Sequence, residues 1–279
     1  IIVTYASYAR RNMSEKNIRS CVLCLGGLDP SGGAGIQADI EAVAATGAHA
    51  LTLATCLTVQ NSQQTLAMQA VDAHLIQQQL ECLQTDMPIH ACKIGVLPNA
   101  KTASIIAAFL SHLEDIPVVF DPVMRATVGI HFAEQESWQT IQQELLPQVT
   151  ICTPNQAELT LLSGLDAAPS RQAGLLLEYG LDALLVTAAD EDTVDVQNTL
   201  YRPDNDPIDY IWPRLNAHYH GSGCTLSSAL ASRLAQGEDL VDAVKQAQNY
   251  VQYSLKRGQA LGQGQHIPNR VQTNKESFS

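Results

Sequence analysis

Short β-rich runs alternate with segments of helical periodicity through most of this chain, and no other feature of the sequence constrains the fold as strongly. Parallel strands need crossover connections, which are usually helices, so the alternation predicts an α/β fold with a mostly parallel sheet covered on both faces. Ligands of such sheets bind beyond the carboxyl ends of the strands. The expected strands are 21–25, 50–59, 91–95, 118–120, 149–152 and 183–187, and the expected helices are 34–46, 73–83, 101–113, 137–146 and 155–162.

The region 190–213 departs from this alternation, because acidic residues and prolines surround two strand-like pieces. We expect a β-hairpin here, close to the ligand site. Its strands are predicted at 196–201 and 208–212, and two further helices are predicted at 224–236 and 240–257, with a polar tail from Gly258 onward.

Length and composition indicate one large domain rather than two small ones. The chain has 279 residues, of which 46% are hydrophobic, so it can bury a sizeable core. Residues 1–20 are predicted to be a loose extension, because their basic residues follow an apolar stretch and a signal peptide has the opposite order; Met13 is a candidate native start. The predicted domain covers 21–268, and 269–279 are predicted to be a tail.

The charge balance argues against two classes of partner. A formal net charge of −12 disfavours nucleic acid and anionic membrane surfaces, since a polyanion is attracted to neither. The sequence also lacks a run of about 18 apolar residues that could span a bilayer. An anionic small molecule would therefore have to be held locally, by amides, a metal ion and a few cationic side chains.

The cysteines indicate a reducing compartment. Seven of them, an odd number, are spread through expected core strands, which suits a cytoplasmic protein better than a disulfide framework. Cys21 and Cys24 form a CxxC pair, but they lie in the first expected strand and no second pair exists. We therefore expect buried thiols there rather than zinc ligands.

The segment 220–228 reads HGSGCTLSS and places two glycines at the start of an Ala/Leu/Ser-rich helix. Free amides and the positive end of the helix dipole converge at such a start, so a phosphate can bind there. The same field is expected to lower the pKa of the Cys224 thiol. The segment thus outlines a phosphoryl-transfer site, although on its own an ordinary glycine-capped helix start is the more common interpretation.

A second glycine-rich segment, 26–39, follows the first expected strand and lets a ligand lie against the main chain. It lacks the GxxxxGK[ST] of a P-loop and the glycine spacing of a dinucleotide fingerprint. Its DPSGGAGIQAD, at 29–39, resembles the signature of the hydroxymethylpyrimidine/phosphomethylpyrimidine kinases, in the ribokinase-like superfamily. The segment 220–228 is similar to that family's HGTGCTLS motif, with Ser222 in place of threonine, and further matches are KIG at 93–95, DPVM at 121–124 and TPNQAE at 153–158.

This resemblance, which covers about residues 21 to 268, implies a ribokinase-like three-layer sandwich and a cytoplasmic kinase of thiamine biosynthesis that uses ATP and Mg²⁺. The implied substrates are the small molecule 4-amino-5-hydroxymethyl-2-methylpyrimidine and its monophosphate, and the family suggests a homodimer. The implied site residues are Cys224 as the base with the amides of Gly221, Ser222 and Gly223, then Gln60, Gly27, Asp39, Thr58 and Val96 for the pyrimidine, Asn155, Thr187 and Lys93 for the nucleotide, and Asp121 and Glu158 for Mg²⁺.

Several of these assignments can be weighed by their chemistry. The Gln60 carboxamide offers a donor beside an acceptor, which complements an aminopyrimidine edge, whereas without the resemblance an ordinary strand-end glutamine is favoured. Asp121 ends an expected buried strand, and carboxylates suit Mg²⁺ because it prefers oxygen ligands. Glu158 alone reads as a solvated acid in the first turn of a helix. Lys93 is as compatible with a structural role as with phosphate binding, and for His220 a structural role in the loop is favoured slightly.

The sequence departs from the family pattern on the nucleotide side. Thr187-Ala188-Ala189-Asp190 stands where the family commonly has a Gly-Gly-His run, and Arg125-Ala126-Thr127-Val128-Gly129 replaces Val-Ala-Thr-Ser-Gly. Val96 replaces a frequent methionine and would leave a roomier pocket over the substrate ring. Two alternatives therefore stay open: a pyridoxal or pyridoxine kinase, and a weakly active protein that senses the pyrimidine.

Overall fold

The computed structural model describes residues 19–113, 115–123, 135–188 and 193–271, and all of its strands except one coincide with the predicted ones. These strands are β1 (Cys21–Leu28), β2 (His49–Gln60), β3 (Thr65–Ala70), β4 (Ala91–Ile94), β5 (Val118–Phe120), β6 (Ile151–Cys152), β7 (Ala183–Val186), β8 (Asp195–Tyr201) and β9 (Ile208–Pro213). Within the described residues they form one sheet in the order β3-β2-β1-β4-β5-β6-β7-β8-β9. Pairing is parallel from β2 through β7 and antiparallel at β3, β8 and β9.

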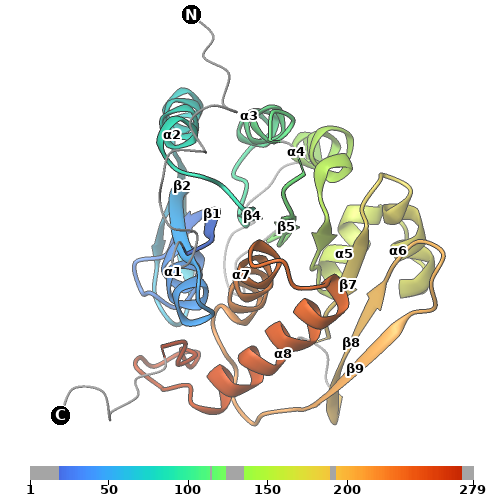
Figure 1. Ribbon diagram of the computed structural model, residues 1–279. Coiled ribbons are helices and arrows are strands. Elements are labelled where there is room, and N and C mark those ends of the chain that lie inside the picture. The colour runs from blue at the N-terminus through green and yellow to red at the C-terminus, as the bar shows by residue number, and fades with distance from the viewer. Residues whose placement is uncertain (1–18, 114, 124–134, 189–192, 272–279) are drawn as a thin grey trace, which may run out of the picture.

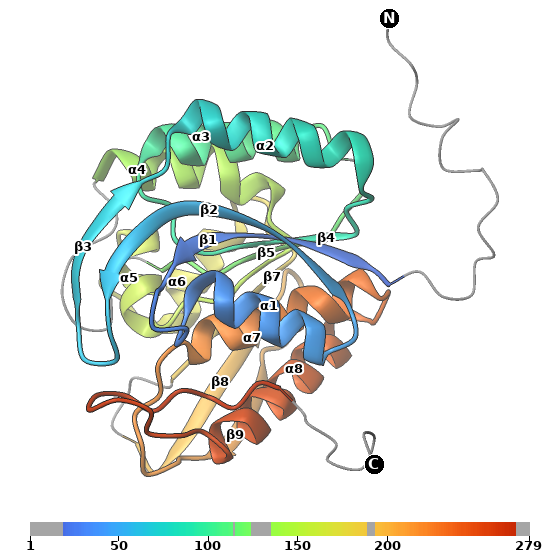
Figure 2. The ribbon, with the colours of Figure 1, turned by 90° about the vertical axis from the view of Figure 1, so that its left-hand side faces the viewer.

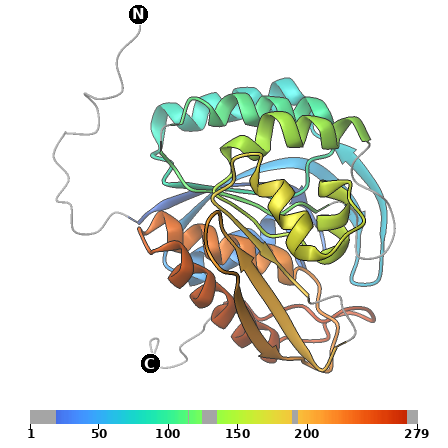
Figure 3. The same cartoon turned by 90° about the vertical axis from the view of Figure 1, so that its right-hand side faces the viewer.

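Helices cover both faces of this sheet (Figures 1 and 3). One face carries α2 (Ala73–Asp86), α3 (Ala100–Leu110), α4 (Gln135–Thr140), α5 (Gln156–Ser163) and α6 (Pro169–Leu177), and the other carries α1 (Gly35–Ala45), α7 (Ser222–Ala235) and α8 (Leu240–Lys256). A π-helical turn (Ile141–Leu145) and a 3₁₀ turn (Leu146–Gln148) continue α4. The predicted three-layer α/β sandwich is confirmed.

Strand β1 illustrates why the central strands read as continuous apolar runs. Leu23 and Leu25 pack with α2 and α3, whereas Val22 and Cys24 pack with α1, α7 and α8. A parallel strand covered on both faces needs apolar side chains at consecutive positions, and each large one buried contributes roughly 1.5–3 kcal/mol. The first strand and the glycine-rich loop that follows it therefore rest on a rigid base.

Side-chain caps define the starts of several helices. Asp72 accepts hydrogen bonds from the amides of His74 and Leu75 at the start of α2, and the Asn99 side chain accepts one from Thr102 at the start of α3. Each cap satisfies amides that have no partner within the helix. These helix boundaries are thus encoded locally.

The sequence-based boundaries hold for most elements, and the differences have local causes. Strand β3 and helix α6 were not predicted, and the predicted helix 137–146 is divided between α4 and the two turns. The predicted hairpin is confirmed as β8 and β9. Helix α7 begins at Ser222 rather than Cys224, which brings both glycines of the motif into its first turn or its cap.

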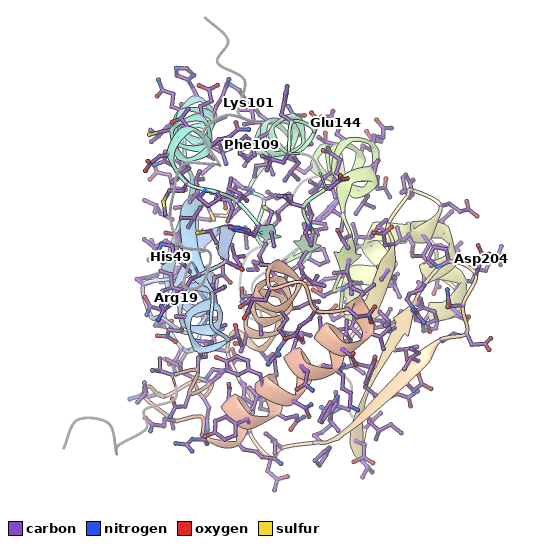
Figure 4. All side chains as sticks on the ribbon, in the orientation of Figure 1. Arg19, His49, Lys101, Phe109, Glu144 and Asp204 are labelled. Atoms are coloured by element: carbon purple, nitrogen blue, oxygen red, sulfur yellow. The ribbon has the colours of Figure 1, made fainter. Side chains whose placement is uncertain are left out.

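The chain beyond α8 is folded as far as residue 271, although we predicted a polar tail. Arg270, which falls within that predicted tail, is 1% exposed. Figure 4 shows Lys101, Glu144 and Asp204 at the rim of the molecule, where all three are exposed. In the described part of the chain, no helix combines the length and the apolar composition that crossing a bilayer requires.

Candidate active site

The glycine-rich loop, residues 26–35, and the N-terminus of α7 meet at the carboxyl ends of the central strands. Asp29 organises the loop, since its carboxylate accepts hydrogen bonds from the Ser31 amide at 2.9 Å, the Ser31 hydroxyl at 2.7 Å and the Ala34 amide at 2.9 Å. Two left-handed glycines allow the close approach. A Cβ on Gly35 (φ 59°) would collide with the Gly27 carbonyl, and one on Gly221 (φ 75°) would collide with the Gly33 carbonyl.

Cys224 lies where the N-termini of α1 and α7 converge. The Gly35 amide in the first turn of α1 lowers the pKa of its thiol, and the thiol in turn lowers the pKa of Asp121, so both groups lie beside the sulfur. Part of its surface remains exposed, yet protein atoms surround the sulfur closely. The predicted amide cluster of Gly221, Ser222, Gly223 and Cys224 thus sits in the cap and first turn of α7, beside the Asp121 side chain.

The expected lowering of the Cys224 pKa is wrong. Desolvation, opposed by Lys93 and reinforced by the carboxylates of Asp121 and Asp39, raises the pKa of this thiol to about 12. The helix-start argument considers only local amides. The two carboxylates come from the end of β5 and from α1, which are distant in the sequence, so an argument from the helix start alone could not include them.

We expect Cys224 to react slowly with iodoacetamide at about pH 8, because only the thiolate attacks and the raised pKa keeps the thiol protonated. The exposed Cys82 on α2 provides an internal control. Mass spectrometry of the labelled peptides over time would give both rates. Labelling of Cys224 as fast as that of Cys82 would contradict the raised pKa.

Lys93 and Asp39 form a buried ion pair directly beneath this site. The Lys93 Nζ lies 2.8 Å from Asp39 Oδ1, and neither side chain is exposed. The Ser228 hydroxyl of α7 donates to the same oxygen at 2.6 Å. Desolvation alone would lower the pKa of Lys93, but attraction to Asp39, Cys224 and Asp121 outweighs it, so the pKa is raised and the ammonium stays charged.

This burial corrects two sequence-based assignments. Lys93 was expected to contact the nucleotide and Asp39 the pyrimidine, but neither has surface that a ligand could touch in this arrangement. Both residues support the floor of the site instead. Lys93 interacts electrostatically with Cys224 and Asp121, so the ion pair still influences the groups that would face the ligand.

The expected nucleotide and metal residues lie at neighbouring strand ends. Asp121 follows β5, is 4% exposed and accepts a hydrogen bond from the Ser227 hydroxyl at 3.2 Å, and its burial raises its pKa. Asn155 and Glu158 form a capping box at the start of α5. Thr187 follows β7 and pairs with Asn155 in an isolated bridge. Asp121 and Glu158 both raise the pKa of Cys152, so they flank the same thiol.

The described residues contain no cluster of three or more His, Cys, Asp and Glu side chains that could hold a metal ion. Mg²⁺ does not require one, because it usually binds through one or two carboxylates together with phosphate oxygens and water. The carboxylates of Asp121 and Glu158 fit that donor set. Asp121 directly follows β5 and lies beside Gly223 of α7, and Glu158 lies in the first turn of α5, which follows β6.

The predicted pyrimidine residues surround the end of β1. The Gln60 amide lies 2.8 Å from His220 Nε2, and that nitrogen lies 2.8 Å from Asp29 Oδ2. Thr58 donates its hydroxyl proton to the Leu28 carbonyl at 3.0 Å. Gly27 is buried, and a Cβ on it would lie 4.0 Å from Val96. The candidate residues for the ring thus lie beside the glycine-rich loop, which also contacts Cys224 through Gly35.

Comparison with known proteins gives the family of this chain. Residues 29–269 match the family model described as phosphomethylpyrimidine kinase. The chain belongs to this family. A hydroxymethylpyrimidine/phosphomethylpyrimidine kinase of Synechococcus elongatus is 33% identical over 258 residues, which is 87% of this chain and 94% of the relative.

Solved structures agree with the fold of the phosphomethylpyrimidine kinase family. An ADP complex of Bacillus subtilis pyridoxal kinase superposes with a TM-score of 0.83 and 25% identity, and covers 91% of this chain and 98% of its own. A phosphomethylpyrimidine kinase from Clostridium difficile gives a TM-score of 0.72 and 28% identity, over 83% of this chain and 97% of its own. The chain is therefore a kinase of ribokinase-like fold, and its family uses ATP.

Of the noted departures from the phosphomethylpyrimidine kinase pattern, one lies outside the described residues and another is described only in part. The segment 125–129 and residues Ala189 and Asp190 lie outside the described residues. Ala188 is described: its amide donates to the Asn198 side chain at 3.1 Å, and its carbonyl accepts from Arg214 at 3.2 Å. The segment after β7 is therefore joined to β8 and to the chain that follows β9.

Sequence reasoning missed two groups that build this kinase site. Asp29 was seen only as part of the signature, although an Asp-Pro-Ser sequence before glycines is a typical turn in which aspartate accepts from the amides that follow. His220 lies between Gln60 and Asp29, which agrees with the structural role that the sequence analysis slightly favoured for it. Arg270 had no local signal, because its partners are far away in the chain.

Proposed function

We propose that this protein transfers the γ-phosphoryl group of ATP to 4-amino-5-hydroxymethyl-2-methylpyrimidine and then to the resulting monophosphate, in thiamine biosynthesis. One observation carries the proposal: a single loop, residues 26–35, lies beside Cys224 at Gly35, and its Asp29 shares the Nε2 atom of His220 with Gln60 as a neighbour at 2.8 Å. Gln60, which would bind the pyrimidine ring, and Cys224, which would face the reacting hydroxyl, are thus positioned by the same loop.

The transferred phosphoryl group would be stabilised by the amides of Gly221, Ser222, Gly223 and Cys224. These groups occupy the cap and first turn of α7, where backbone amides lack partners within the helix. Preorganised donors act most strongly where charge develops in the transition state. An acidic protein needs such local donors, since its net charge of −12 repels a triphosphate.

Cys224 would act as the base of the first reaction through a relay. The substrate hydroxyl proton would move to the sulfur while the thiol proton moves to the neighbouring carboxylate of Asp121. The hydroxyl oxygen then bonds to the γ-phosphorus as the bond to the bridging oxygen of ADP breaks. The raised pKa of Asp121 favours its acceptance of the proton.

A bound Mg²⁺ would neutralise charge on the phosphates of ATP. We assign it to Glu158, with Asp121 as a second candidate, although a cation on Asp121 would oppose its role in the relay. Asn155 and Thr187 would orient the nucleotide, because their bridge places them at adjoining strand ends. A carboxylate has two oxygens, so the capping box of Glu158 is compatible with metal binding.

The Gln60→Ala variant should bind the pyrimidine about 10-fold to 100-fold more weakly, since a bidentate contact contributes about 1–3 kcal/mol. ATP affinity should stay unchanged, because the carboxamide lies on the ring side of the site beside His220. Calorimetric titration of both ligands would measure this. Unaltered pyrimidine affinity would overturn the recognition role.

The decisive test incubates the pure protein with the pyrimidine alcohol and Mg²⁺-ATP, and identifies products by mass spectrometry. We expect the monophosphate first and the diphosphate later. Parallel assays with pyridoxal address the alternative that the Bacillus subtilis pyridoxal kinase fold relationship keeps open. Stabilisation by the pyrimidine without ADP release would indicate a sensor instead.

We also propose that the protein is a cytoplasmic homodimer. The seven cysteines are free in the described structure, which suits a reducing compartment. Leu57, Val59 and Leu66 are 46%, 57% and 61% exposed on the β2–β3 hairpin, and such apolar exposure supports contact with a second copy. Light scattering of the purified protein would give its mass.

A further inference from the structure

The chain after α8 forms a strap, residues 258–271, that contacts three parts of the site. Figure 2 shows it running from the end of α8 towards the tip of the β2–β3 hairpin and then back beneath α7 and α1. The Gln265 amide donates to the Ser62 carbonyl in the hairpin turn at 2.9 Å. The His266 carbonyl accepts from the His220 amide at 2.9 Å. The strap ends at Arg270, which reaches the glycine-rich loop.

All five N–H groups of the Arg270 guanidinium have an acceptor within reach, although the side chain is fully buried. Nε donates to the Thr225 hydroxyl at 2.8 Å. One terminal nitrogen donates to the Gly32 carbonyl at 3.4 Å and faces Glu41 at 3.3 Å. The other donates to the carbonyls of Gly33 and His220.

Two of these contacts fix the direction of amides in the proposed anion site. In a trans peptide the carbonyl and the next N–H point in opposite directions. Because Arg270 binds the His220 carbonyl, the Gly221 N–H of the same peptide points away from the guanidinium. The Gly221 carbonyl accepts from the Thr225 amide at 3.0 Å and from the Thr225 hydroxyl at 2.7 Å, and this hydroxyl accepts from Arg270, so Arg270 supports the orientation of the Ser222 N–H too.

We infer that Arg270 is a positioning residue for phosphoryl transfer, which holds the Gly221 and Ser222 amides towards the migrating group and the glycine-rich loop against α7. The inference rests on the proposed function. Lysine cannot replace arginine here, because three donors at one point cannot serve five separated acceptors.

The Arg270→Ala variant should lose about 10-fold to 100-fold in kcat with little change in the KM for the pyrimidine, since misdirected amides affect mainly the transition state. Arg270→Lys should recover little. Millimolar guanidinium should restore part of the activity of Arg270→Ala, whereas urea should not. Thr225→Val, which removes the hydroxyl that connects Arg270 to the Gly221 carbonyl, should also lower kcat, but by a smaller factor.

The Tyr250→Phe variant separates positioning from stability. The Tyr250 hydroxyl donates to the Arg270 carbonyl at 2.8 Å and so anchors the strap without touching the guanidinium contacts. It should lower the melting temperature while leaving kcat near the wild-type value. The inference is overturned if folded Arg270→Ala keeps wild-type kcat, or if Tyr250→Phe loses kcat in the same proportion.

A binding measurement distinguishes failure of this inference from failure of the proposed function. Calorimetry with Mg²⁺ and either AMP-PCP or ADP reports how well the γ-phosphoryl position is bound, without turnover. Arg270→Ala should reduce the preference for AMP-PCP over ADP, and an unchanged preference with unchanged kcat contradicts the inference. A wild-type protein that binds both nucleotides but leaves the pyrimidine unphosphorylated contradicts the proposed function alone.

Discussion

Replacing Cys224 with alanine should slow the first phosphorylation by about 10²-fold to 10³-fold, because the substrate hydroxyl then has no acceptor for its proton. The second phosphorylation should slow much less. Its nucleophile is a phosphate oxygen that is already ionised, so a base has little effect there. Single-turnover measurements with the alcohol and with the monophosphate, each mixed with Mg²⁺-ATP, would give the two rates.

The Cys224→Ser variant is the matched control for this experiment. A serine hydroxyl beside the Asp121 carboxylate and the Gly35 amide can donate to the first and accept from the second. It should therefore retain more of the first reaction than alanine does. Equal losses in both reactions for the alanine variant would mean that the thiol acts in positioning or anion binding instead.

Replacing Lys93 with methionine should lower the free energy of unfolding by about 3–5 kcal/mol, because it leaves the Asp39 carboxylate buried without its cation. Asp39 would keep only the Ser228 hydroxyl and would face the buried Asp121 without compensation. Urea denaturation at neutral pH would measure the loss. The site above the pair should lose activity as well, since the pair supports its floor.

Two further variants make this prediction specific to the ion pair. Lys93→Met combined with Asp39→Asn removes both charges and should regain much of the lost stability. Lys101→Met removes an exposed lysine at the start of α3 and should change stability by less than about 0.5 kcal/mol. If the double variant were as unstable as the sum of the two single ones, the charges would not be coupled.

Features encoded within a few residues were the ones the sequence made predictable. The glycines and Cys224 of the 220–228 segment identify a helix start, and α7 does begin there. Strand β1 was recognisable as an apolar run. Strand β3 was not, because five of its six side chains are at least partly exposed at the edge of the sheet.

Features that depend on distant segments could not be predicted in this way. The local dipole argument for Cys224 was outweighed by burial of the sulfur, and further by Asp121 and Asp39, which the ends of β5 and α1 bring beside it. Lys93 was assigned to the nucleotide because a lysine after a strand can reach a phosphate, but its partner lies 54 positions earlier. Helix α6 carries the proline that often opens helices, a local signal that was overlooked.

Arg270 contacts the carbonyl of Gly33, a residue 237 positions earlier in the chain. Contacts between such remote positions form late in folding, because closing a very long loop is entropically costly. During synthesis the glycine-rich loop is made early, whereas its partner Arg270 is added only after nearly all of the polypeptide has been made. Full catalytic competence should therefore appear only once the C-terminal strap has docked, and a nascent or C-terminally clipped chain should turn over slowly even where most of the sheet has already assembled.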